Sequence, residues 1–227
     1  MKKRFFLWFF LLFFLTTYNY QSEKDPSPGF FFIKEVEIEG VKNSNKEELE
    51  KRLDSIGKKN IIFLSEKDFK EVVKDMDFIN SLEVQKIYPK KIKVTVIEDL
   101  PIGVYPDDNG EEHLLLENNK SIKNHNYEFE NLPKVYGEGA LEKFSDFYSS
   151  LQKIGLNLKL VKQFNYYHVN RWDLLLEDEK LIKLPPENYE ESVIKFLEIY
   201  ENTDFEKFKV FDFRIKNELI MRWWKKR

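Results

Sequence analysis

A long apolar run near the N-terminus restricts this chain more than any other part of its sequence. Eleven consecutive apolar residues, Phe5–Leu15, follow the basic tripeptide Lys2-Lys3-Arg4. As a helix, residues 5–20 would be about 24 Å long, slightly shorter than the hydrocarbon core of a bilayer, which is about 30 Å thick. A signal peptide needs small residues one and three positions before its cleavage site, and residues 15–22 contain no such pair. The run therefore predicts an uncleaved membrane anchor, with a cleaved signal peptide as the alternative.

The residues around this run predict its orientation. Basic residues in short flanking loops favour the cytoplasmic side of a membrane, so we expect residues 1–4 to form a cytoplasmic tail. Residues 5–20 would be a single transmembrane signal anchor, whose tyrosines suit the membrane interface. Residues 21–29 contain two prolines, which predicts a linker. The domains that follow would then lie on the far side of the membrane, which in a bacterium is the periplasm or the cell exterior.

Composition argues against several classes of function. The chain has 37 Lys and Arg against 40 Asp and Glu, and its basic residues gather at the two termini, which leaves the middle acidic. An acidic body argues against binding nucleic acid. The absence of cysteine removes disulfides, thiolate nucleophiles and sulfur-based zinc sites. His113, His125 and His168 lie far apart, and no glycine-rich phosphate loop occurs. We therefore expect no metal, no cofactor and no small-molecule substrate.

Residues 30–100 begin with the pattern of a strand and a helix. Apolar residues alternate with glutamates over residues 35–39, which is typical of a half-buried strand. Ser44 and Glu47 have the spacing of a capping box, and they predict the start of the first helix. Gly57 predicts its end, because glycine suits the left-handed conformation that closes many helices.

A second helix and two strands complete this segment. Ser65 and Asp68 form a further capping box before an apolar helical stripe. Residues 82–87 and 92–97 then alternate as strands on either side of Tyr88-Pro89-Lys90, which predicts a hairpin turn. The predicted order is strand, helix, helix, strand, strand.

Residues 101–227 combine short strands with two helices, so the chain as a whole is predicted to be α+β. Strand candidates lie at residues 114–116, 158–164, 173–176, 180–184, 208–214 and 218–224. Residues 141–154, followed by Gly155, and residues 189–200 carry aromatic and aliphatic side chains at helical spacing, which predicts a packed core. We expect a mostly antiparallel β domain with two helices.

The polar residues do not have the pattern of an enzyme. Asp107, Glu111 and His113 belong to the densest polar cluster, whose composition is that of a solvated turn. Asp212 and Arg214 share one face of a strand, where an ion pair is the expected role. No catalytic residue is predicted, because neither a nucleophile with a base nor a pair of carboxylates at a working distance is evident.

Short segments along the chain carry a resemblance to a known family. In the first half these are Val36–Gly40, Asn60–Leu64, Val84–Val94 and Glu98–Gly103. In the second half they are Leu132–Gly137, Arg171–Leu174, Leu181–Pro185 and Phe211–Arg214. Together they resemble the FtsQ/DivIB family of bacterial cell-division proteins. The resemblance implies a POTRA domain over residues 30–100 and an FtsQ-type C-terminal β domain over residues 101–227.

The resemblance also implies a function. It implies a divisome scaffold, held in the inner membrane by residues 5–20 as a single-pass type II protein and concentrated at the division septum. Such a scaffold binds the FtsB/FtsL complex, links early and late division proteins and helps control septal peptidoglycan synthesis. The hairpin at Tyr88 and Pro89 is a candidate recruitment surface.

The terminal strand is the predicted partner site. An edge strand offers unpaired backbone groups to which a partner strand can add. The resemblance implies that FtsB binds there, at Arg214, Ile215, Leu219, Ile220, Met221, Arg222 and Trp223. Two alternatives are a POTRA-containing protein of transport or outer-membrane assembly, and a secreted protein released from a signal peptide.

Overall fold

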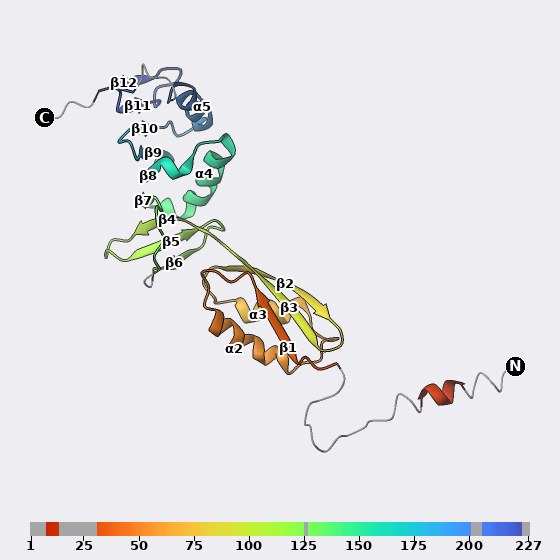
Figure 1. The fold of residues 1–227 in the computed structure, drawn as a ribbon. Helices are drawn as coiled ribbons and strands as arrows, with labels where there is room; N and C mark the ends of the chain where they lie inside the picture. The colour runs from red at the N-terminus through yellow and green to blue at the C-terminus, as the bar shows by residue number, and fades with distance from the viewer. Residues whose placement is uncertain (1–7, 14–30, 125–126, 201–205, 224–227) are drawn as a thin grey trace.

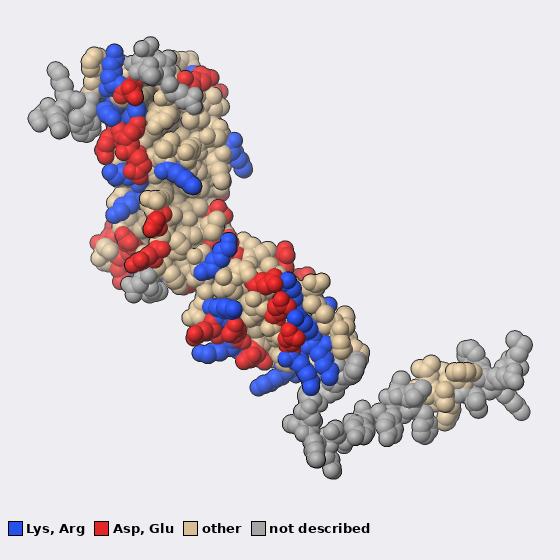
Figure 2. Space-filling model, in the orientation of Figure 1, with Lys and Arg blue, Asp and Glu red and all other residues tan. Residues whose placement is uncertain are grey.

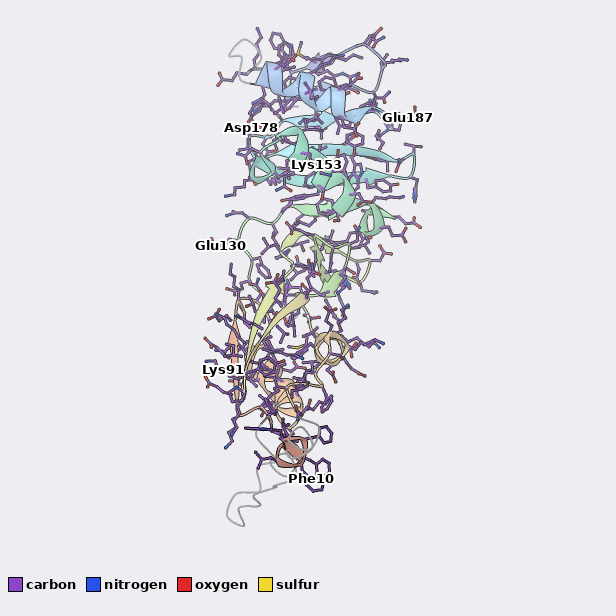
Figure 3. All side chains as sticks on the ribbon, turned by 90° about the vertical axis from the view of Figure 1, so that its right-hand side faces the viewer. Phe10, Lys91, Glu130, Lys153, Asp178 and Glu187 are labelled. Carbon is purple, nitrogen blue, oxygen red and sulfur yellow. The ribbon has the colours of Figure 1, made fainter. Side chains whose placement is uncertain are left out.

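The computed structural model describes residues 8–13, 31–124, 127–200 and 206–223. Figure 1 shows an N-terminal and a C-terminal domain lying end to end. Of the predicted anchor, the structure describes a short helix at residues 8–13, whose exposed side chains include Phe10 (Figure 3). The tail 1–4, the rest of residues 5–20 and the linker 21–29 lie outside the described residues. Among the residues described, no helix is both long enough and apolar enough to cross a membrane.

The N-terminal domain has the predicted order of elements. They are β1 (Glu35–Glu39), α2 (Lys46–Gly57), α3 (Glu66–Val73), β2 (Ile79–Ile87) and β3 (Lys91–Glu98). The sheet order is β1-β3-β2, with β1 parallel and β2 antiparallel to the central strand β3. Apolar side chains of both helices pack with those of β3 in one core, which includes Leu49, Leu53, Phe69, Ile92 and Val94. The strand-helix-helix-strand-strand prediction is confirmed.

The caps of the first helix differ from the prediction. The side chain of Asn45, not Ser44, accepts a hydrogen bond from the amide of Glu48 and caps α2. Ser44 is engaged elsewhere, because its hydroxyl donates to the carbonyl oxygen of Asp77. Gly57 lies within the last turn, so it does not provide the predicted left-handed cap. The capping box at the start of α3 is confirmed.

The C-terminal domain is built on one large sheet. Its strands are β4 (Pro101–Pro106), β5 (Glu112–Leu116), β6 (Ser121–Lys123), β7 (Lys134–Tyr136), β8 (Val161–Tyr167), β9 (Arg171–Leu176), β10 (Leu181–Lys183), β11 (Val210–Asp212) and β12 (Ile220–Arg222). The order is β12-β11-β10-β9-β8-β7-β4-β5-β6. Parallel pairings join β4 to β7, β7 to β8 and β10 to β11, and the other neighbours are antiparallel. The α+β class is confirmed, with a more mixed sheet than expected.

Helices α4 (Ala140–Ile154) and α5 (Tyr189–Tyr200) pack against this sheet through an aromatic core. The ring of Phe147 on α4 stacks on Trp172 of β9, with centroids 4.7 Å apart and planes 5° apart. Phe196 of α5 packs edge-on against Phe211 of β11, with centroids 5.2 Å apart. The helical stripes are therefore packed core, as predicted.

Several short elements of this domain were not predicted from the sequence. Strand β4 begins and ends at a proline, and β6 and β7 have three residues each, so none carries a long alternating pattern. Residues 158–160 form a 3-10 turn (η1) rather than the start of a strand, because the Asn157 side chain accepts from the amide of Lys159. Gly137 leads from β7 towards α4 with φ of 113°, where a Cβ atom would lie 2.2 Å from the carbonyl oxygen of Tyr166.

A small core joins the two domains. Phe78, just before β2, is buried with Leu114 and Leu116 of β5, and its ring meets Tyr127 edge-on at 4.8 Å. Beside it, the buried carboxylate of Asp99 accepts hydrogen bonds from the side-chain amides of Asn80 and Asn118, one from each domain. Burial raises the pKa of Asp99. The junction is thus both apolar and hydrogen-bonded.

Candidate partner-binding edge

Strand β12 is the last strand of the large sheet and has a free outer edge. It pairs antiparallel with β11, so that Met221 lies opposite Phe211. The amide of Phe213 donates to Lys183 of β10, and Phe211, two residues earlier, faces the same way. The backbone groups of Met221 therefore point away from β11, towards the free edge. Among the described residues, this places an unpaired donor and acceptor at the middle of β12.

The side chains of β12 alternate between the core and solvent. Leu219 and Met221 pack against the aromatic core of the domain, whereas Arg222 is exposed. Trp223 is 64% exposed, and its ring lies 5.6 Å from that of Phe208. The edge thus presents an aromatic side chain beside free backbone groups, a combination suited to a protein partner. Trp224 lies outside the described residues.

An ion pair fixes the arginine next to this edge. Arg214 donates from Nε and Nη2 to the two carboxylate oxygens of Asp212, at 2.8 and 2.6 Å. Hydrogen bonds from Arg214 lower the pKa of Asp212, which is buried, while the Arg214 side chain stays 40% exposed. The predicted pair is confirmed, and it orients a positive charge towards solvent.

Charged residues continue from this pair across the same part of the sheet. Asp173 of β9 lies opposite Lys183 of β10, which in turn lies opposite Asp212 of β11. Arg171 places its Nε 3.3 Å from the Asp173 carboxylate, and its guanidinium lies 3.9 Å from the centre of the Tyr167 ring. Burial raises the pKa of Asp173. Sequence reasoning missed this cluster, although the spacing of Arg171 and Asp173 on one strand face was a usable signal.

A cavity of about 500 Å³ borders the turn between β11 and β12. Arg214, Ile215 and Leu219 line one side of it, and the loop before α5 lines the other with residues that include Glu187 (Figure 3). The structure therefore brings three of the predicted partner residues to one hollow. The other four, Ile220, Met221, Arg222 and Trp223, continue along β12.

The second predicted surface lies elsewhere. Tyr88 and Pro89 form the turn between β2 and β3, and Tyr88 is 58% exposed. In Figure 1 this turn is at the far end of the N-terminal domain from β12. The structure does not bring the two predicted surfaces together.

One group of potential metal ligands occurs among the described residues. Donor atoms of Asp107, Glu111 and His113 lie within 4.8 Å of one another. However, Asp107 accepts hydrogen bonds from the amides of Asn109 and Glu111, and Glu111 pairs with Lys123 at 2.7 Å. The contacts of Asp107 close the β4–β5 hairpin, and the ion pair of Glu111 joins this turn to β6, as expected for a solvated turn.

The two domains define a class: a POTRA-bearing protein whose second domain is a mixed sheet covered by two helices. A family model described as "POTRA domain, FtsQ-type" matches residues 31–98. A second, "Cell division protein FtsQ/DivIB, C-terminal", matches residues 103–214 and ends before β12. The chain belongs to the FtsQ/DivIB family of cell-division proteins.

Individual relatives agree with this assignment. A cell division protein FtsQ from Rickettsia bellii is 27% identical over 191 residues, which cover 83% of this chain and 71% of the relative. One from Rickettsia conorii is 26% identical and covers 90% of this chain and 76% of the relative. The Rhizobium meliloti protein is 24% identical over 68% of this chain, which spans about half of that relative (50%). The family is one of cell-division scaffolds rather than a known enzyme family.

Proposed function

We propose that this chain is a divisome scaffold that binds the FtsB/FtsL complex by strand addition to β12. Through that contact it links early and late division proteins and helps control septal peptidoglycan synthesis. The observation that carries the proposal is the free edge of β12, where the backbone of Met221 points outwards. Main-chain hydrogen bonds to such an edge supply affinity, and the neighbouring side chains supply specificity.

The residues around the edge fit this role. Arg214 offers a charge that Asp212 holds in place, and Trp223 offers an exposed aromatic surface next to the strand. Arginine and tryptophan are frequent anchors of protein interfaces. We include the membrane in the proposal: residues 5–20 anchor the chain in the inner membrane, residues 1–4 stay cytoplasmic, and the folded domains act in the periplasm at the septum.

The test is a titration of the full chain in detergent against the extracytoplasmic FtsB/FtsL coiled coil of the same organism. Met221→Pro removes the outward donor at the middle of β12 without removing a hydrogen bond to β11. We expect saturable binding by the unchanged chain and a loss of at least tenfold in affinity for Met221→Pro.

Met221→Val is the matched control, because it keeps the amide donor and an apolar side chain. It should bind within about threefold of the unchanged chain. Equal binding by Met221→Pro, with an unchanged circular dichroism spectrum, would contradict docking at β12. Failure of the unchanged chain to bind would contradict the choice of partner.

A further inference from the structure

The POTRA domain has a free sheet edge of its own. The order β1-β3-β2 leaves β2 outermost, and no strand of the described residues lies on its outer side. Strand β2 runs for nine residues, Ile79–Ile87, which is about 30 Å at 3.4 Å per residue. It is three times as long as β12, which has three residues. Such an edge can pair with an added strand along most of its length.

A groove runs beside this edge. A cavity of about 700 Å³ lies between β2 and α3, and both elements line it. Phe69 and Val73 of α3 contribute buried apolar side chains, and Leu82 and Val84 of β2 are half-buried on the strand face that contacts the core. Because strand side chains alternate, an added strand would place every second side chain on the groove side of the sheet. The groove thus fits alternating apolar residues.

The charged residues around the groove favour a partner with a net negative charge. Lysines line it from α3, from β2 and from the neighbouring domain, whereas its carboxylates are Glu66 and Glu83. The lysines are Lys70, Lys74, Lys86 and Lys120. Lys70 pairs with Glu66 at 3.9 Å, a longer contact than the two 2.8 Å pairs of Lys91 with glutamates on the sheet face, and the four lysines outnumber the two carboxylates of the groove. The face of this domain in Figure 2 instead carries intermingled charges of both signs.

Two of these lysines are placed to meet a ligand. Lys70 and Lys74 are exposed on the last turn of α3 and just beyond it, above the apolar floor. Lys86 is half-buried and donates from Nζ to the carbonyl oxygen of Leu64 at 2.8 Å, and both residues line the groove. A second copy of this chain would bring the same lysines to the edge, so charge disfavours pairing of β2 with itself.

We infer that the β2 edge and the β2–α3 groove bind an extended, acidic segment of another protein as a fourth strand of the POTRA sheet. Apolar side chains of the segment enter the groove, and its carboxylates meet the lysines. This site is separate from β12, so its partner need not be the one proposed above.

The probe is a random library of nine-residue peptides displayed on phage and selected on the immobilised full chain. We expect enrichment of peptides that alternate apolar residues with Asp or Glu. A synthetic peptide of the enriched sequence should protect β2 amides from hydrogen exchange and bind more weakly as the salt concentration rises.

Charge reversal gives a matched pair of variants. Lys70→Glu with Lys74→Glu should weaken the peptide at least tenfold, because both lysines line the groove. Lys51→Glu with Lys67→Glu makes the same change in net charge at exposed helix positions outside the groove and should stay within twofold. All four positions are exposed, so the fold is expected to persist in both variants.

Three outcomes would overturn the inference: no enrichment of acidic peptides, protection of amides elsewhere than β2, or an equal response of the two double variants. The Met221→Pro variant should bind the peptide normally. If Met221→Pro failed to bind the peptide, the peptide would bind at the β12 edge and not at β2. The two proposals can therefore fail separately.

Discussion

Asp212 and Arg214 show how a buried carboxylate can present a charge at the surface. The bidentate hydrogen bonds lower the pKa of Asp212, so the folded state favours its ionised form more than the unfolded state does. This contribution to stability is present above the ordinary pKa of an aspartate and is lost as the pH falls towards the lowered value. The pair therefore stabilises the domain at neutral pH, and this stabilisation disappears in acid.

We expect Asp212→Asn to lower the free energy of unfolding by about 1 kcal/mol at pH 7, since the partially exposed guanidinium limits the strength of the pair. The difference from the unchanged chain should shrink in acid, below about pH 4, where Asp212 begins to bind a proton in the unfolded chain. Urea unfolding at several pH values measures both effects.

Asp108→Asn is the control for that experiment, because Asp108 is an exposed residue of the β4–β5 turn. It should change stability by less than about 0.5 kcal/mol. A difference between Asp212→Asn and the unchanged chain that does not vary with pH would contradict the assigned role of the ion pair.

At the level of elements, the N-terminus of helix α2 tests whether a helix cap can be predicted from the local sequence. The sequence pattern favoured Ser44 as the cap, but in the structure Asn45 accepts from the amide of Glu48. Asn45→Ala should therefore cost about 1 kcal/mol, in the usual range for loss of a helix cap. Ser44→Ala removes one exposed hydrogen bond to Asp77 and should cost less. Thermal unfolding of the two variants decides between them, and a larger loss in Ser44→Ala would restore the first reading.

The sequence predicted elements where a periodic pattern was long enough to show. It predicted β2, β3 and all the helices from α2 to α5, because these have eight or more residues and one apolar face each. It missed β4, which has a proline at each end, and β6 and β7, which have three residues each and lie in no predicted strand segment. These strands exist because neighbouring strands pair with them, a tertiary effect that no short window contains.

The candidate site was predictable to a similar degree. The Asp212–Arg214 pair followed from spacing along one strand. The cluster of Asp173 and Lys183 did not, because its members come from different strands and depend on the register of the sheet. The β2–α3 groove was not predicted either, since the sequence does not show that β2 is an edge strand of the POTRA sheet.

The whole molecule depends on the junction between its domains. The carboxylate of Asp99 accepts from Asn80 on one side and Asn118 on the other, next to the buried ring of Phe78. Asp99→Ala removes the shared acceptor and leaves both amides unpaired, so we expect the two domains to move more freely.

Distances between spin labels can measure this effect. The chain has no cysteine, so Lys67→Cys and Lys153→Cys provide unique label sites on exposed helix positions, one in each domain. We expect a narrow distance distribution in the unchanged junction and a broader one with Asp99→Ala. Asp108→Ala serves as the control and should leave the width unchanged, whereas equal widths for both variants would contradict the role of Asp99.

The shortness of β12 has a mechanical consequence. Three residues of ladder hold it to β11, so a pull on the C-terminal end would peel this strand away before it disturbs the aromatic core behind it. A partner strand bound on its outer side would make β12 an interior strand, with backbone hydrogen bonds on both of its sides. A partner strand bound to β12 would then also raise the force that is needed to pull β12 away from the sheet.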